Sequence, residues 1–170
     1  LDEFYRVFAI NMRDLGTPVY GKDFFRNLLD SLDGQAWLVI ARIEGRAVGC
    51  AFLTGYKGRM EIPWASTLRR YNHTSINMIM YWKALEFAIQ QGYDVFDFGR
   101  CSHDAGTYRF KQQWGAQPLT LHWDYLLPEG EALPALNPNN PKFRLLIAVW
   151  QRLPVWVTRL LGPHIVKALP

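Results

Sequence analysis

The chain has 170 residues, of which 49% are hydrophobic, 15% aromatic and 20% charged, and its formal net charge is +4. This composition is typical of a compact globular protein and excludes an intrinsically disordered chain, a collagen and a coiled coil. Two cysteines are too few for a disulfide framework or a cysteine-rich zinc site, and no apolar run reaches the roughly 18 residues of a membrane-spanning helix.

The positive charge is concentrated near the C-terminal end. Up to Glu131 the chain carries 14 basic and 15 acidic residues, whereas five basic residues and no acidic one follow. The main part of the chain therefore offers no overall field for nucleic acid. Because the sequence begins at Leu1 and its first residues already have a helical pattern, we expect it to be part of a longer protein.

Apolar periodicity predicts two helices followed by three strands. The helices are expected over 4–15 and 23–32, and each is followed by a glycine that ends it. Strand-like runs follow, separated by short glycine-containing loops typical of hairpins, at 36–43, 47–54 and 60–65. Pro63 indicates an edge, a bulge or the end of pairing in the third run.

The next part of the chain is expected to alternate helices with strands. The predicted elements are a long helix from Thr74 or Ser75 to Gln91, a strand at 93–98, a helix at 107–114 and a last strand at 119–127. Strands joined first by hairpins and then by crossover helices form a mixed sheet with helices on both faces. The predicted fold class is therefore α/β, with an α+β mixed sheet.

The C-terminal region is predicted to be a separate segment. Residues 1–127 are expected to form one domain, 128–141 a linker rich in Pro and Asn, and 142–170 a basic amphipathic helical tail. Within 143–161 a broad apolar face lies opposite a polar arc, and Pro154 is expected to kink the helix. Two Trp, basic residues and no acid are typical of a helix lying on an anionic membrane, although packing against a preceding domain would bury the same face.

Two short motifs have more than one interpretation. Residues 97–99, Asp-Phe-Gly, spell the magnesium-binding tripeptide of protein kinases, but the other kinase motifs are absent and the match is attributed to chance. Asp97 is predicted either to cap the following turn or to orient a substrate. Residues 101–104, Cys-Ser-His-Asp, contain the residue types of a catalytic triad. Consecutive residues in a turn, however, rarely aim a base at a nucleophile, so a triad is not expected here. The four histidines show no spacing typical of a metal site.

A cationic segment follows the strand at 93–98. Its helix begins beyond a strand end, where open α/β sheets bind their ligands. Arg100, Arg109 and Lys111 lie near the helix N-terminus, and these cations with the free amides there suit an anionic substrate or a developing oxyanion. The alternative is an amphipathic helix whose Tyr108 and Phe110 lie partly in the core.

Three segments of the sequence carry a family resemblance. They are Asn-Met-Ile-Met-Tyr-Trp at 77–82, Phe-Asp-Phe-Gly-Arg at 96–100 and Gly-Thr-Tyr-Arg-Phe-Lys-Gln-Gln-Trp-Gly at 106–115. They resemble the C-terminal GNAT-like half of FemAB-type proteins of the GNAT superfamily, above all the FemAB-related group associated with PEP-CTERM/exosortase and exopolysaccharide systems. The resemblance implies a GNAT-like acyltransferase fold for residues 1–127, with a preceding N-terminal GNAT-like domain as partner.

The resemblance also implies an activity. Such a protein is expected to be an N-acyltransferase or aminoacyltransferase that moves an acyl or aminoacyl group to an amine of a cell-envelope precursor, peptidoglycan-like or linked to exopolysaccharide. The acceptor would be a small molecule or a glycopeptide, and the donor acyl-CoA or aminoacyl-tRNA, with no tightly bound cofactor. The expected location is the cytoplasm, and peripheral contact with the inner membrane would run through 142–161.

The resemblance assigns Lys111 to the neighbourhood of the reacting carbonyl and Phe110 to the pocket wall. Glu61 is predicted to be a general base for the amine or, alternatively, a solvated strand residue. The predicted substrate contacts are Arg100, Arg109, Asp97, Tyr108, Trp64 and Asn72, with the two arginines suited to phosphate or carboxylate oxygens.

The sequence departs from the family pattern in two places. The loop 68–74 lacks the Arg/Gln-x-x-Gly-x-Gly/Ala signature that holds the pyrophosphate of coenzyme A, and no helical arm for tRNA is present, so the donor stays open. A non-enzymatic alternative is a catalytically degenerate GNAT-like module that binds envelope polysaccharide or an assembly partner.

Overall fold

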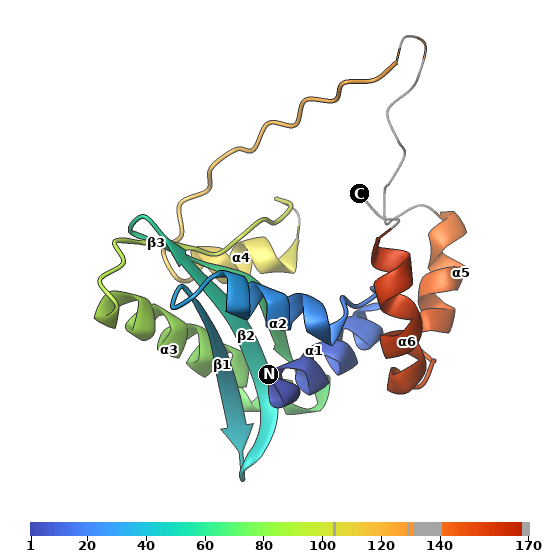
Figure 1. The fold of residues 1–170 in the computed structure, drawn as a ribbon, viewed down its shortest axis with the longest axis horizontal. Coiled ribbons are helices and arrows are strands. Elements are labelled where there is room, and N and C mark those ends of the chain that lie inside the picture. Colours follow the sequence, from blue (N-terminus) through green and yellow to red (C-terminus); the bar gives the residue numbers. More distant parts are fainter. Residues whose placement is uncertain (104, 129, 131–140, 168–170) are drawn as a thin grey trace.

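A computed structural model describes residues 1–103, 105–128, 130 and 141–167 of the chain (Figure 1). The elements within these ranges are α1 (Asp2–Leu15), α2 (Lys22–Ser31), β1 (Ala36–Ile43), β2 (Arg46–Tyr56), β3 (Arg59–Thr67), η1 (Arg69–Thr74), α3 (Ile76–Gln90), β4 (Val95–Asp97), α4 (Gly106–Gln112), α5 (Pro141–Trp150) and α6 (Val155–Val166). The predicted mixed α/β class is confirmed. The predicted linker falls almost wholly outside the described residues.

The four strands form one mixed sheet in the order β1-β2-β3-β4. The first three strands are antiparallel, and β4 runs parallel to β3 after the crossover through α3. Two-residue turns join the antiparallel strands, and their residues have positive φ: 48° at Glu44, 75° at Gly45, 46° at Lys57 and 76° at Gly58. These angles are those of type I′ turns, whose twist matches that of the flanking strands.

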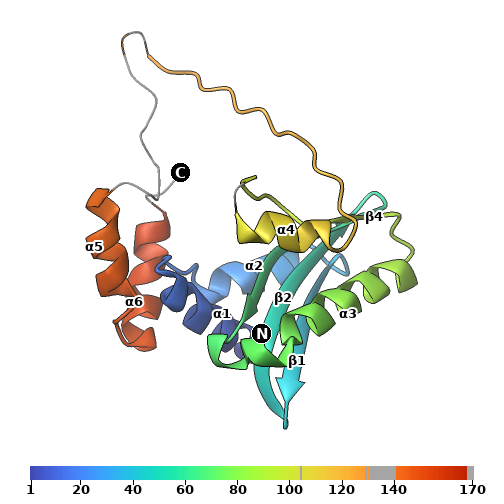
Figure 2. The ribbon, with the colours of Figure 1, turned by 180° about the vertical axis from the view of Figure 1, so that it is seen from behind.

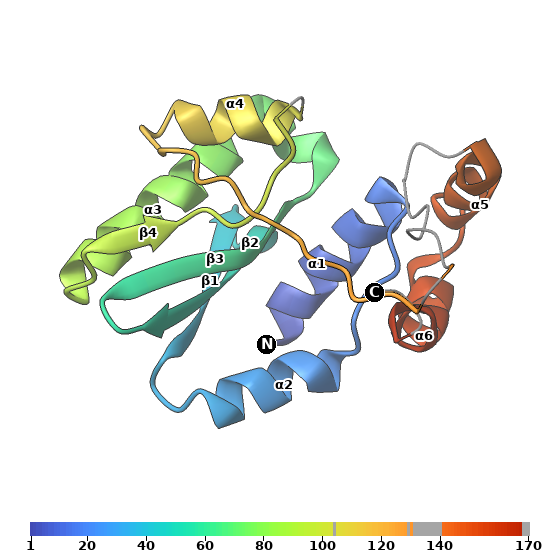
Figure 3. The same ribbon diagram turned by 90° about the horizontal axis from the view of Figure 1, so that it is seen from above.

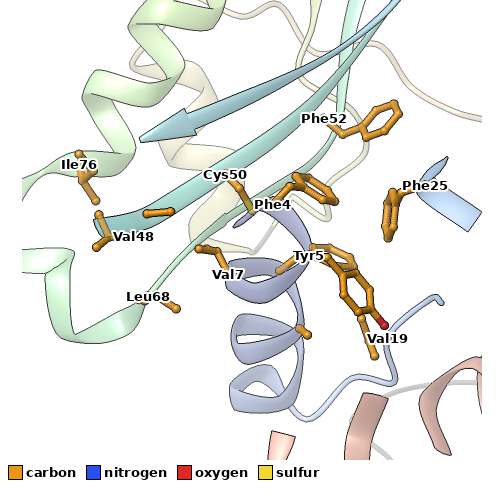
Figure 4. Packing of buried hydrophobic residues seen from close by; sticks show 13 residues of the cluster. Phe4, Tyr5, Val7, Val19, Phe25, Val48, Cys50, Phe52, Leu68 and Ile76 are labelled. Atoms are coloured by element: carbon orange, nitrogen blue, oxygen red, sulfur yellow. The ribbon is translucent and has the colours of Figure 1, made fainter. Parts of the chain in front are cut away.

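Helices cover both faces of the sheet, as the sequence predicted. Helices α1 and α2 lie on one face, and α3 and α4 lie on the other (Figures 2 and 3). On the α1 face the rings of Phe4, Phe25 and Phe52 meet with centroids 5.0 to 5.9 Å apart (Figure 4). On the α3 face the buried side chains include Leu53 and Met60. The sheet therefore separates two apolar cores, and β1, β2 and β3 supply both of them by alternation.

Strand β3 contains a bulge. Its pairing with β2 shifts by one residue between Phe52 and Thr54, so that Ile62 and Pro63 of β3 both lie opposite Leu53. Proline lacks an N–H for the ladder and is tolerated at such an interruption. The bulge is therefore one of the three outcomes that Pro63 indicated in the sequence.

The bulge reverses the alternation of side chains along β3. Met60 and Ile62 pack in the core on the α3 face, whereas Trp64 packs in the core on the α1 face although it lies only two residues beyond Ile62. Glu61, between Met60 and Ile62, points to the α1 face by the same alternation. The bulge thus places Glu61 and Trp64 on one face of the sheet.

The prediction of a last strand at 119–127 is wrong. These residues have no regular secondary structure, and the segment leaves the body of the domain near α4 and runs away from the sheet (Figure 1). Leu119 is 80% exposed and Trp123 is 63% exposed. Alternation of apolar and polar residues predicted a strand, but a strand also requires a paired neighbour, and β4 has only three residues.

The predicted single, kinked tail helix is two helices. Helix α5 ends at Trp150 and α6 begins at Val155, so Pro154 separates them and occupies the position before the first residue of α6. Pro is well suited to such a helix start and poorly suited to a helix interior. Helix α6 packs against α1 of the same domain.

The contact between α6 and the body depends on a glycine. A Cβ atom at Gly162 would lie 2.8 Å from the main-chain N and O of Val19. We therefore expect Gly162→Ala to force α6 away from the segment around Val19 and to lower the free energy of unfolding by about 1–3 kcal/mol. Chemical denaturation measures this change. Gly106→Ala, where the added methyl group meets open space, is the control, and equal stability of the two variants would contradict the prediction.

Candidate active site

Two carboxylates lie next to each other where β4 ends. Glu61 of β3 pairs with Asp97 of β4 in the parallel register. Phe96 and Phe98 pack in the core on the α3 face, so Asp97 between them points to the α1 face, as Glu61 does. Two of the predicted site residues, from segments 36 positions apart, are thus brought together by the crossover through α3.

The environment of Glu61 raises the pKa of its carboxyl group. Partial burial raises the pKa of Glu61, and the negative charge of Asp97 raises it further, while Arg59 opposes the shift. A carboxylate whose pKa is raised in this way is a stronger base once ionised and is better matched to proton transfer near neutral pH. The site therefore contains the kind of group that accepts a proton from an amine.

Asp97 orders the loop that follows it. Its Oδ1 accepts a hydrogen bond of 2.8 Å from the N–H of Gly99, and its Oδ2 lies 3.3 Å from an Nη of Arg59. The first contact is the turn-capping role that the sequence left open for Asp97. Arg59 is a site residue that the sequence analysis missed. Its position two residues before Glu61, on the same face of the strand, was the available signal.

Lys111 of α4 is fixed against the same loop. Its Nζ donates hydrogen bonds of 2.7 Å to the carbonyl oxygen of Gly99 and 2.8 Å to that of Arg100. An ammonium group has three N–H donors, so these bonds leave one. Lys111 and Glu61 are therefore connected through Asp97 and the main chain of Gly99.

An aromatic cluster lies on the same face of the sheet as Glu61, the α1 face. Trp64 is in contact with Tyr20 and Phe24, with ring centroids 6.1 and 5.8 Å away, and with Phe25 at 5.3 Å. Trp64 is half-buried, so part of its indole remains available to a ligand. An apolar wall next to a carboxylate is consistent with the desolvation that raises the pKa of Glu61.

Beyond Glu61 the edge of β3 is open. Strand β4 pairs with β3 only at Arg59, Met60 and Glu61, and in the described part of the chain no strand continues this pairing. The N–H of Leu68 donates a hydrogen bond to the carbonyl oxygen of Val48 in β2. In an antiparallel pair only every second residue bonds to the partner strand, so the residues of β3 in between direct their N–H and C=O groups away from β2. These outward-directed residues are Ala65 and Thr67.

The open edge leads to the N-terminus of α3. Ser75, one of the two predicted helix starts, occupies the N-cap position with φ of 54°, and its side chain makes no capping hydrogen bond. Arg70 and Asn72 are exposed in η1, and Arg69 donates a hydrogen bond to the main chain of Asp14. A helix N-terminus beside arginines is an environment that favours phosphate groups.

Four predicted side chains are placed elsewhere. The ring of Phe110 packs on Tyr81 in the core, 4.9 Å between centroids, and does not line the loop. Tyr108 contacts His103, and Arg109 is exposed. The guanidinium of Arg100 lies 5.1 Å from the ring of Trp123, in the segment that leaves the body of the domain.

Comparison with protein families identifies the fold. Residues 1–112 match the model of a family described as an acetyltransferase (GNAT) domain. This match covers more than half of the chain, and the chain belongs to the GNAT acetyltransferase family. Members of this N-acetyltransferase family take acyl-CoA as a substrate.

Solved structures show the same fold. The chain is similar to an aminoglycoside acetyltransferase from an uncultured soil metagenomic sample, with a TM-score of 0.59 and 13% identity over 75% of this chain and 88% of that one. It is also similar to a ribosomal-protein-alanine N-acetyltransferase from Brucella melitensis biovar Abortus 2308, with a TM-score of 0.57 and 15% identity over 74% and 91% of the two chains. No curated protein shows a significant match.

The charge of Asp97 is expected to control the protonation of Glu61. Asp97→Asn removes the negative charge that raises the pKa of Glu61 and leaves Arg59, which lowers it. We therefore expect the pKa of Glu61 to fall in this variant, as measured by NMR titration of its side-chain carboxyl carbon. Asp94→Asn, at an exposed residue just before β4, is the control. An unchanged or higher pKa in Asp97→Asn would show that the two carboxylates do not interact.

Proposed function

We propose that the protein transfers an acyl group from acyl-CoA to an amine, with Glu61 as the general base. The observation that carries this proposal is the carboxylate pair at the end of β4, in which burial and Asp97 raise the pKa of Glu61. An amine is protonated at neutral pH and must lose a proton before it attacks. A carboxylate with a raised pKa on an accessible strand face suits that step.

The proposed donor site is the open edge of β3. The arm of acyl-CoA carries amide groups, and the outward main-chain groups of Ala65 and Thr67 suit hydrogen bonds with such an arm, as an added strand would make them. From Glu61 to Thr67 the strand spans about 20 Å, at roughly 3.3 Å per residue. The thioester would then lie near Glu61, with the phosphates near Arg70 at the N-terminus of α3.

The proposed reaction transfers the acyl group from the sulfur of the donor to the nitrogen of the acceptor. Glu61 accepts a proton from the ammonium form of the acceptor, and the amine nitrogen forms a bond with the thioester carbonyl carbon. The tetrahedral intermediate carries an oxyanion, to which we assign the remaining N–H of Lys111. The carbon–sulfur bond then breaks, and the nitrogen of the intermediate loses its second proton, which the departing thiolate takes up, to give the amide and the thiol of coenzyme A.

The finer identity of the substrates rests on the sequence resemblance. We propose that the acceptor is an amine of a cell-envelope precursor, because the segments 96–100 and 106–115 resemble FemAB-type proteins of the PEP-CTERM-associated group. Aminoacyl-tRNA is the alternative donor under this proposal. The tandem arrangement with an N-terminal GNAT-like domain and the cytoplasmic location remain predictions.

The position of Phe110 supports a second candidate function. Because this ring packs on Tyr81 and is only partly exposed, less of it is available to shape a substrate pocket, as expected of a degenerate module that only binds polysaccharide or a partner. A panel of acyl-CoA and aminoacyl-tRNA donors with amine acceptors, followed by mass spectrometry, separates the two functions. A transferred group supports the enzyme, whereas no transfer from any donor, with retained binding of a polysaccharide, would favour the module.

Replacement of the general base should slow the chemical step. We expect Glu61→Gln to lower kcat by about 10²- to 10⁴-fold with little change in the KM for the donor. The wild-type rate should fall as the pH drops below the pKa of Glu61, because the base must be ionised, and this limb should disappear in the variant. Glu86→Gln, which alters an exposed pair with Lys83 on α3, is the control. A variant with the wild-type pH profile would exclude Glu61 as the base.

Replacement of Lys111 tests the oxyanion assignment. We expect Lys111→Ala to lower kcat by about 10²- to 10³-fold, the effect typical of removing one oxyanion donor. Steady-state kinetics with saturating donor measures kcat, and circular dichroism verifies that the variant is folded. The control is Lys83→Ala, at an exposed lysine of α3. A folded Lys111→Ala variant with wild-type kcat would remove Lys111 from the mechanism.

A further inference from the structure

The outward side of α6 combines large apolar side chains with basic ones. At 100° per residue, four side chains fall in an arc of about 80°. These residues, which we call the outer stripe, are Trp156, Leu160, His164 and Lys167. Trp156 is 69% exposed and Leu160 is 62% exposed. Burial of such side chains is favourable, so the stripe is suited to contact with another apolar surface.

The opposite side of α6 is already occupied. Thr158 is 1% exposed, and Gly162 allows the close approach to the main chain of Val19. The guanidinium of Arg159 lies 5.0 Å from the ring centroid of Tyr5 in α1. These contacts hold α6 on its own domain and leave the outer stripe largely exposed. The buried face of α6 is therefore explained by these contacts within the chain, without a preceding domain.

An open cavity lies at one edge of the outer stripe. Its volume is about 370 Å³, and its lining residues are Tyr5, Gly21, Lys22, Trp156, Arg159 and Leu160. Lys22 forms an ion pair with Asp2, whereas the described part of the chain shows no ion pair for Arg159. The cavity therefore combines two cations with two side chains of the stripe. This combination is suited to a phosphate group attached to an apolar chain.

The charges that α5 and α6 themselves carry are all positive. Five basic residues and no acidic one follow Glu131. Helix α5 adds exposed apolar side chains, with Leu145 at 72% and Leu146 at 64%, next to the exposed Arg144. In a two-fold contact between copies of this surface, cations would face cations, which is unfavourable. An anionic surface with an apolar interior complements both the positive charge and the exposed apolar side chains of α5 and α6.

We propose that α5 and α6 dock the protein on the surface of an anionic phospholipid membrane, with Trp156 and Leu160 in the interface and a lipid phosphate in the cavity beside Arg159 and Lys22. A basic helix with exposed Trp and Leu is the typical form of an interfacial helix. No α-helix within the described ranges has the length and apolarity required to cross a bilayer. The proposal is independent of acyl transfer, because none of these residues belongs to the candidate active site.

Co-sedimentation with vesicles tests the proposal. The full chain is mixed with vesicles of phosphatidylcholine alone or with 30% phosphatidylglycerol, at low and high salt. We expect binding to the anionic vesicles, weaker binding at high salt and little binding to pure phosphatidylcholine. Equal binding to both vesicles, or none to either, would overturn the proposal. A dimer in light scattering without vesicle binding would assign the surface to a second copy and overturn it as well.

Matched variants locate the contact. Trp156→Glu should weaken binding on the order of tenfold or more, because it removes apolar burial and adds a repelled charge. Arg159→Gln should weaken it about fivefold, the effect of one cation near an anionic surface. The controls are Trp123→Glu, at an exposed Trp outside the tail, and Arg46→Gln, at the exposed start of β2. Circular dichroism verifies folding, and equal loss of binding in the control variants would refute the assigned surface.

Discussion

The bulge at Ile62 and Pro63 is the constraint on which the candidate active site depends. It inserts one extra residue into β3 opposite Leu53 and so reverses which face each later side chain occupies. Without it, Glu61 and Trp64 would point to opposite faces of the sheet, and the acid and the aromatic wall would be separated. Pairing between β3 and β4 also ends at Glu61, immediately before the bulge. The bulge thus puts Glu61 and Trp64 on the same face, and it lies where the open edge of β3 begins.

The electrostatics of the site follow from the parallel pairing of β4. The register places Asp97 beside Glu61, where its charge and partial burial together raise the pKa of the glutamate. Asp97 in turn holds the N–H of Gly99, and Lys111 holds the carbonyl oxygens of the same loop. Asp97 and Lys111 therefore each have defined partners, and these contacts fix the loop between β4 and α4 from both sides. Pre-organised polar groups of this kind are those from which enzymes obtain most of their catalytic effect.

Much of the fold could be predicted from the sequence because it depends on local patterns. Glycine-containing turns and alternation located the hairpins of β1, β2 and β3, and a 3.6-residue period located α1 and α3. The segment 119–127 shows where this reasoning fails, because a pattern of alternation does not reveal whether a neighbouring strand exists to pair with it. Pro154 predicted a kink within one helix, whereas α5 already ends at Trp150 and Pro154 occupies the position directly before α6.

The candidate site was only partly accessible to sequence analysis. Glu61, Asp97 and Lys111 were selected by residue type and resemblance; the structure pairs Glu61 with Asp97 and links Asp97 to Lys111 through the main chain of Gly99. The role of Phe110 was not predictable, since an aromatic residue next to a cation is equally compatible with a pocket wall and with a core. Arg59 was missed because its contribution depends on the register between β3 and β4, which is a tertiary property.

Hydrogen–deuterium exchange with and without acetyl-CoA tests the account most directly, because it reports on the main chain of β3 itself. If the donor lies along the open edge beyond the bulge, the amides of Ala65 and Thr67 should exchange more slowly in its presence, while those of β1 should not change. Slower exchange at β3 would support both the donor site and the role of the bulge. Bound acetyl-CoA with no protection of these two amides would contradict the account.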